Sequence, residues 1–180
     1  MSPRPAPDLD VRRDQVVRAA RDLAETAGWT DVTMRRLAGV LGVSQPVLYS
    51  AFAGRQALID AVALAGFADL ATALDAAETS PAARMQAYLD FAAAHPRLYE
   101  AMFLLPSGLA FAVDDPPEPL VRAFRGLRAA FPDGDETRAE VAWALWHGLA
   151  TLAAGGRLRV DAAHARLDLA LHMLTERETG

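Results

Sequence analysis

Few residues in this chain have the types and spacing that metal sites use. His164, Asp168 and His172 recur every four residues near the C-terminus, so on a helix they form one stripe of possible ligands. Because a helix rises about 1.5 Å per residue, the two histidines lie about 12 Å apart, too far to share one ion. We predict no metal site, and we interpret the stripe as a solvated or interface edge.

Covalent and cofactor chemistry has equally little support. The chain has no cysteine, which excludes disulfides, thiolate zinc sites and a cysteine nucleophile. It has no Glu-x-x-His pair for a di-iron site, no glycine-rich phosphate loop and no nucleophile elbow. We predict that the protein is not an enzyme and binds no cofactor. Catalysis by His147 with a distant acid stays open as the alternative.

Polar residues between positions 44 and 50 favour contacts with nucleic acid. Gln45 follows Ser44, a candidate N-cap, and at a helix start it can form two hydrogen bonds with an adenine edge. The ring of Pro46 offers a small apolar surface for a thymine methyl group. Tyr49 and Ser50 can donate hydrogen bonds to phosphate oxygens. This segment therefore predicts a base-reading surface.

Cationic residues flank that segment. Thr33 is the expected N-cap of the preceding helix, whose free N–H groups can bind a phosphate. Arg35, Arg36 and Arg55 can add phosphate contacts. The alternative is that these arginines form only a solvated face and Tyr49 only packs, which is common for single residues but less so for the whole set.

The elements that position these residues have helix-turn-helix spacing. A helix over 34–40 ends at Gly42, and a second short helix begins at Ser44 and ends near Phe52. Pro46 lies in the first turn of the second helix, where a missing N–H does no harm. The two helices are expected to pack through Leu37, Ala38, Leu41, Val43, Val47 and Leu48.

Apolar residues at helical spacing dominate the rest of the chain, which predicts an all-α fold. Asp8 and Asp10 are candidate caps for a first helix that ends at Gly28, with Trp29 packed behind it. Residues 106–119 are predicted to form a loop and 132–135 a turn. Further helices are expected over about 55–77, 81–94, 96–103, 120–131, 136–154 and 161–177.

Charge and composition divide the chain unevenly. Residues 1–66 hold eight arginines and seven acids (net +1), whereas the remainder holds ten arginines and sixteen acids (net -6). We expect a disordered tail over 1–10, a helix-turn-helix domain over 11–54 that contacts DNA, and a second helical domain over 55–180, whose ligand-binding and dimerisation roles are what a family resemblance described below implies. The sequence shows no signal peptide and no run of about 20 apolar residues, so we expect a cytoplasmic protein without a membrane span.

The segment TMRRLAGVLGVSQPVLYSAFAGRQALIDAV resembles the signature of the TetR family of transcriptional regulators. Ala51 and Arg55 depart from the family pattern, which usually has His and Lys there, so one phosphate contact is expected to be missing. The resemblance implies an operator-binding homodimer, a repressor released by a small-molecule effector. The matching positions are Thr33, Ala38, Gly42, Val43, Leu48, Tyr49, Phe52 and Leu58.

The C-terminal part resembles one class of the same family, through HPRLYEAMF at 95–103 and the Trp146-His147-Gly148 triplet. The resemblance implies an unidentified effector bound between helices and dimerisation through the last two helices. A TetR-like interaction or ligand-binding module that does not bind DNA is the alternative. The expected pocket residues, each of which could instead be a core residue, are Tyr99, Met102, Phe103, Trp143, Trp146 and His147.

Overall fold

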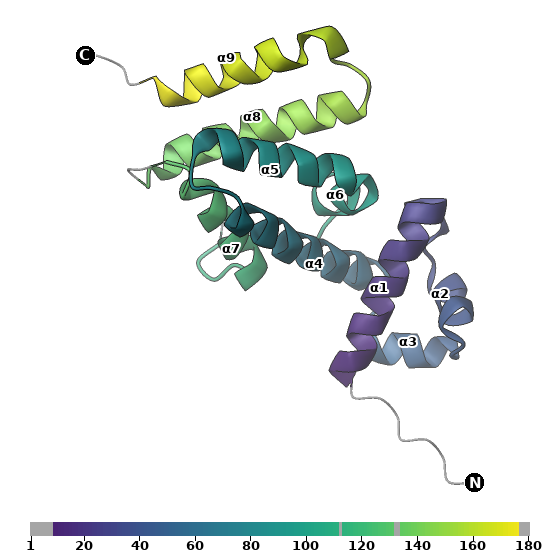
Figure 1. Cartoon of the computed structure of the whole chain (residues 1–180). Helices are drawn as coiled ribbons and strands as arrows, with labels where there is room; N and C mark the ends of the chain where they lie inside the picture. Colours follow the sequence, from purple (N-terminus) through teal and green to yellow (C-terminus); the bar gives the residue numbers. More distant parts are fainter. Residues whose placement is uncertain (1–8, 112, 132–133, 177–180) are drawn as a thin grey trace. The chain divides into compact units, whose positions relative to one another are not determined.

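The computed structural model describes residues 9–111, 113–131 and 134–176, and all regular secondary structure in these ranges is helical (Figure 1). This confirms the all-α prediction. The helices are α1 (Leu9–Ala27), η1 (Trp29–Asp31), α2 (Met34–Leu41), α3 (Gln45–Ala51), α4 (Arg55–Ala76), α5 (Pro81–Ala94), α6 (Pro96–Phe103), α7 (Glu118–Arg128), α8 (Glu136–Ala154), η2 (Val160–Ala162) and α9 (Ala163–Thr175).

The ends of some helices differ from those predicted. α1 begins at Leu9, so two residues assigned to the tail are helical, and Asp10 lies in the first turn rather than at a cap. The other candidate cap, Asp8, lies outside the described residues. α7 begins earlier than predicted, because Pro117 rather than Pro119 precedes its first turn, and it ends at Arg128 rather than Phe131. α9 spans Ala163–Thr175 instead of the predicted 161–177, and the single turn η2 precedes it.

The chain forms two compact units. The first contains residues 1–66 and 97–112, and the second contains residues 67–96 and 113–180. The division falls inside α4, whereas the predicted domain boundary lies at the start of that helix. α4 therefore belongs to both units.

In the first unit, α1, α2 and α3 enclose a small core, which α4 and α6 extend. Leu37 and Leu48, from the two helices of the predicted helix-turn-helix, are almost fully buried. α6 packs very closely on α4 at Gly66. A Cβ atom there would lie 2.7 Å from Sδ of Met102 and 2.9 Å from Cδ1 of Leu98. A larger residue at this position would therefore displace the Met102 and Leu98 side chains, so the close contact here reflects packing rather than backbone conformation.

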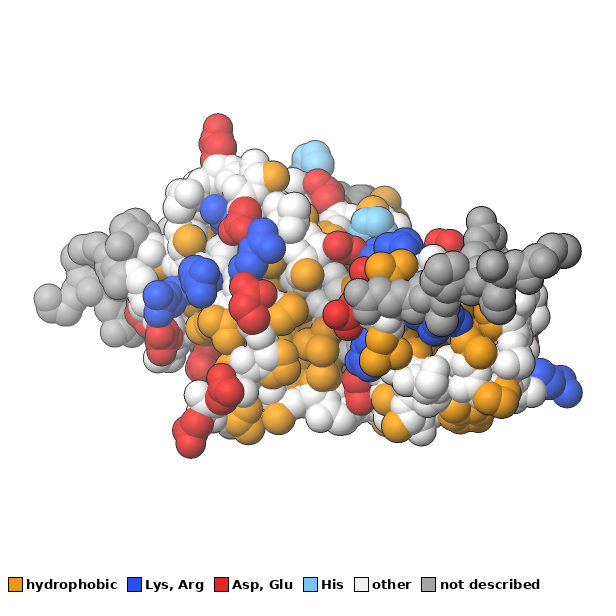
Figure 2. Space-filling view, turned by 90° about the horizontal axis from the view of Figure 1, so that it is seen from below, with side chains coloured by type: hydrophobic (Ala, Val, Ile, Leu, Met, Phe, Trp, Pro, Cys, Tyr) orange, Lys and Arg blue, Asp and Glu red, His pale blue; other side chains and the backbone are white. Residues whose placement is uncertain are grey.

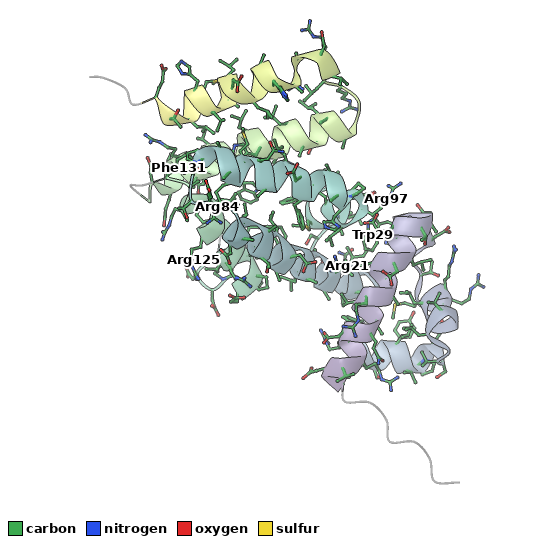
Figure 3. The ribbon with its side chains drawn as sticks, in the orientation of Figure 1. Arg21, Trp29, Arg84, Arg97, Arg125 and Phe131 are labelled. Atoms are coloured by element: carbon green, nitrogen blue, oxygen red, sulfur yellow. The ribbon has the colours of Figure 1, made fainter. Side chains whose placement is uncertain are left out.

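In the second unit, α5 and α8 share an aromatic core. Trp146 and Tyr88 are fully buried, and their ring centroids lie 6.0 Å apart. Arg84 at the start of α5 is also buried, and it donates a hydrogen bond to the Leu74 carbonyl in the last turn of α4 (Figure 3). This guanidinium therefore caps the negative end of the α4 dipole.

Within the described residues, α4 is long and apolar enough to cross a bilayer, with a mean hydropathy of 1.7 over an 18-residue window. Half of that window is buried in the protein, and Leu58, Val62 and Leu70 belong to its cores. Packing therefore accounts for the apolar composition of this helix. Asp60 and Asp69 interrupt the apolar run.

Candidate nucleic-acid interface

The start of α2 and the turn after it are fixed by local hydrogen bonds. The Thr33 hydroxyl accepts a hydrogen bond of 3.2 Å from the Arg36 N–H, which confirms Thr33 as the N-cap. Gly42 ends the helix with φ 65°, a left-handed conformation that suits glycine. The Val43 and Gly42 N–H groups then bond the Ala38 and Gly39 carbonyls, at 3.0 Å and 3.3 Å. The turn between α2 and α3 is thus a Schellman motif.

Ser44 occupies the N-cap position of α3 as predicted, but its side chain accepts no capping hydrogen bond. The prediction of a side-chain cap was wrong, and the cause is local. Pro46, the second residue of the helix, has no N–H to donate. The N–H of Val47 instead bonds the backbone carbonyl of Ser44 at 3.1 Å. The serine hydroxyl is consequently exposed at the start of α3.

α3 has one buried and one exposed face. Leu48 and Ala51 point into the core, whereas Tyr49 is 52% exposed. The Ser50 hydroxyl donates to the Val47 carbonyl at 2.7 Å, so its proton must be redirected before it can bond a phosphate. The side chains predicted to contact DNA are all exposed, namely Thr33, Arg35, Arg36, Ser44, Gln45, Pro46, Tyr49, Ser50 and Arg55.

The three flanking arginines differ in their surroundings. Arg35 is exposed and has no hydrogen bond or ion pair with the described residues. Arg36 pairs with Asp31 at 2.8 Å, and both side chains are about half exposed. Arg55 donates from Nε to the Val32 carbonyl at 2.8 Å and from Nη2 to the Trp29 carbonyl at 2.7 Å. Arg55 therefore holds the entry to α2 in place, and its Nη1 and the second N–H of Nη2 are left for a phosphate.

Two contacts that position α3 and η1 were missed by the sequence analysis. Arg13 of α1 donates to the Ala51 carbonyl at 2.8 Å, and its guanidinium lies 4.7 Å from the Phe52 ring centroid. The indole Nε1–H of Trp29 donates to the Arg97 carbonyl of α6 at 2.7 Å. Both pairs are far apart in sequence, so only the fold reveals them. Figure 3 labels Trp29 and Arg97.

Charges of both signs are mixed on the face drawn in Figure 2, where arginine and acidic side chains alternate among apolar ones. With a net charge of -5, the chain offers no general attraction for DNA. Phosphate contacts therefore depend on local cations and N–H groups, such as those around α2 and α3.

The predicted pocket residues are divided between the two units. Tyr99, Met102 and Phe103 belong to the first unit, where the rings of Tyr99 and Phe103 lie 4.7 Å apart. Trp146 and its neighbours in α8 belong to the second. Tyr99, Met102 and Trp146 are buried, and Phe103, Trp143 and His147 are partly exposed. A single pocket formed by all of them stays a prediction.

Two properties of α8 bear on ligand binding. Burial lowers the pKa of His147 below 6.5, because desolvation disfavours the charged imidazolium. The indole Nε1–H of Trp146 is buried without a hydrogen-bond acceptor in the described part of the chain. Buried donors are almost always paired, so this one needs an explanation.

The stripe of candidate metal ligands lies on the exposed surface of α9. His164, Asp168 and His172 are all exposed, as expected of a solvated or interface edge. His172 contacts Glu176 at 2.9 Å. Within the described ranges, no three His, Asp or Glu side chains are grouped closely enough to hold a metal ion.

Comparisons with known families match both parts of the chain. Residues 16–62, which include the helix-turn-helix, match the family described as bacterial regulatory proteins, tetR family. Residues 82–175, more than half of the chain, match the family described as tetracyclin repressor-like, C-terminal domain. The chain belongs to the TetR family. The narrower Trp-His-Gly class stays a prediction.

Individual relatives agree with this assignment. Tetracycline repressor protein class C of Escherichia coli is 46% identical over 53 residues, which are 29% of this chain and 24% of that repressor. The chain thus spans about a quarter of the length of the curated relatives that it matches. A solved protein of unknown function from Rhodococcus sp. RHA1 is 29% identical, covers 98% of this chain and 100% of its own, and gives a TM-score of 0.67.

A TetR transcriptional regulator from Rhodococcus sp. RHA1 shares the fold, with a TM-score of 0.68 and 21% identity over 96% of this chain and 100% of its own. The arrangement described above is therefore a TetR-family fold.

Proposed function

We propose that this protein is a DNA-binding transcriptional regulator that reads an operator with α3. The observation that carries the proposal is the rigid turn from Thr33 to Ser44, which presents the exposed face of α3 in a chain of the TetR family. A short exposed helix anchored by a buried Leu48 fits the width of a DNA major groove.

The exposed residues receive different roles in this proposal. Gln45 and Pro46 lie in the first turn of α3 and contact base edges, an adenine and a thymine methyl group. Tyr49, Ser50 and the serine hydroxyl at position 44 contact phosphates. Arg35 and Arg36 contribute cations beside them. Arg55 acts mainly by holding the backbone from which α2 starts.

Dimerisation through the last two helices is the second part of the proposal, and Gly148 is its main support. Glycine in the middle of a helix costs about 1 kcal/mol relative to alanine. Nothing lies within 4 Å of the position that a Cβ of Gly148 would occupy, so packing inside the chain does not require glycine there. Gly66 and Gly126, by contrast, face side-chain atoms at 3.0 Å or less.

The surroundings of Gly148 indicate a helix as its partner. Gly148 lies on an outward stripe of α8 whose other members are apolar and repeat every three or four residues. Val141 is 56% exposed and Leu152 39% exposed on this stripe, with Ala144 and Leu145 between them. Since glycine allows two helix backbones to approach closely, we propose that α8 of a second copy crosses here. A dimer then places two α3 helices on an operator with two half-sites.

Effector control is the third part. The buried indole N–H of Trp146 meets no acceptor among the described residues, and a carbonyl or carboxylate oxygen of a bound small molecule would supply one. α4 belongs to both compact units, so a ligand that shifts it changes the spacing of the two α3 helices. A ligand acts in this way only if it binds one spacing more tightly than the other.

Gel retardation with the DNA upstream of the protein's own gene tests the proposal. We expect a retarded complex that weakens steeply as salt rises, because phosphate contacts release counterions. No complex at low salt would instead favour an interaction module that kept the fold without binding DNA. Turnover of a small molecule would favour an enzyme.

A further inference from the structure

α5, α8 and α9 lie side by side in the second unit (Figure 1). They leave a half-open groove where the C-terminal ends of α5 and α8 meet the start of α9. Its volume is about 540 Å³, within the range of small-molecule sites. Alanines account for the space, since Ala93, Ala150 and Ala153 stand where longer side chains would fill it. Leu89 and Leu167 add larger apolar walls.

The charged residues of the groove differ in how well they are satisfied. Asp90 on the α5 side is exposed, and its Oδ1 accepts a hydrogen bond of 2.8 Å from Gln86. Arg166 on the α9 side is only partly exposed. Its guanidinium donates to the Arg159 carbonyl at 3.3 Å and 3.4 Å, the long limit for a hydrogen bond, and pairs with no carboxylate in the described ranges.

We propose that this groove binds an amphipathic organic acid. The carboxylate bonds the Arg166 guanidinium, whose planar fork matches two carboxylate oxygens, and the apolar body lies among the alanines and leucines. An anion is favoured over a cation because the partly buried Arg166 lacks a counter-charge, whereas Asp90 is solvated and already hydrogen-bonded.

The groove is separate from the outward stripe of α8 at which the proposed dimer crosses. A helix turns about 100° per residue, so Ala150 and Ala153 together point to the side of α8 opposite to Gly148 and the outward stripe. None of the outward stripe Val141, Ala144, Leu145, Gly148 and Leu152 lines the groove. Ligand binding here requires neither DNA nor the dimer contact.

Calorimetric titration of the full chain with decanoate, below its micelle concentration, tests the proposal. Decyltrimethylammonium serves as the cationic probe of equal chain length. Arg166→Gln keeps a polar, hydrogen-bonding side chain but removes the charge and the guanidinium fork, and we expect decanoate affinity to fall about tenfold or more. Ala153→Phe fills the groove and should abolish binding. Arg125→Gln, on the exposed surface of α7, is the matched control and should bind as the wild type does.

The site is supported if decanoate binds saturably and more tightly than the cationic probe. This binding should also be lost in both groove variants and kept in the control. Equal binding of the two probes, or unchanged affinity in either groove variant, overturns it. Circular dichroism and sedimentation of each variant, measured without ligand, separate loss of the site from loss of fold or dimer. Retardation of upstream DNA by Arg166→Gln shows independently whether the regulator function holds.

Discussion

Arg55 gives the sharpest prediction, because its position suggests a DNA contact while its hydrogen bonds indicate a structural role. Its guanidinium donates to the Val32 carbonyl at 2.8 Å and to the Trp29 carbonyl at 2.7 Å. In Arg55→Ala both carbonyls lose a charged donor at the point where α2 begins. We expect the variant to be less stable and α2 to be less well positioned.

The magnitude follows from those two bonds. A hydrogen bond to a charged group contributes about 1.5–3 kcal/mol, and the exposure of the arginine places each of these at or below the lower end. We therefore expect the free energy of unfolding to fall by about 2 kcal/mol in total. Arg55→Lys keeps the charge but not the planar fork, so it should lose about half as much.

Urea unfolding followed by circular dichroism measures this loss, with Arg35→Ala as the matched control. Arg35 is equally cationic and exposed but bonds nothing in the described ranges, so its removal should change stability by less than about 0.5 kcal/mol. The reasoning fails if Arg55→Ala unfolds at the wild-type urea concentration, or if Arg35→Ala is destabilised as much.

Three further substitutions test other parts of the structure. Gly148→Leu places a bulky side chain at the proposed crossing of α8, so sedimentation should show a monomer, whereas Ala144→Ser should stay dimeric; a dimeric Gly148→Leu contradicts the proposal. Trp29→Phe removes the indole bond to Arg97 and should lower the unfolding free energy by about 1–2 kcal/mol; unchanged stability would show that the bond contributes nothing. Burial lowers the pKa of His147, so the unfolded chain binds the proton more readily and stability should fall as the pH drops through 6.5 towards the folded value. His147→Asn should flatten this decline in melting temperature, and an unchanged decline would assign it to other groups.

The helices themselves could be predicted from the sequence because their determinants are local. The Thr33 cap, the left-handed Gly42 and the alternation of buried and exposed residues in α3 all depend on neighbours within a few positions. The missing Ser44 cap bond could also have been anticipated, since Pro46 in the first turn removes one of the donors that such a cap serves.

Contacts between distant segments could not be predicted in this way. Nothing near Arg13 or Trp29 in the sequence indicates that their side chains bond the carbonyls of Ala51 and Arg97. Arg55 was predicted to contact phosphate because it is a cation after the helix-turn-helix, and only the fold reveals the two carbonyls beside it. The groove between α5, α8 and α9 likewise depends on where three helices meet.

The role of α3 is tested most directly by competition between operator and random DNA for the Gln45→Ala variant. If Gln45 reads a base, the variant keeps its affinity for random DNA and its salt slope but loses preference for the operator by about tenfold or more. Arg35→Ala should instead weaken binding to both DNAs alike and flatten the salt slope by about one unit. Equal losses on both DNAs for the two variants would contradict the assignment of α3 as the reading helix.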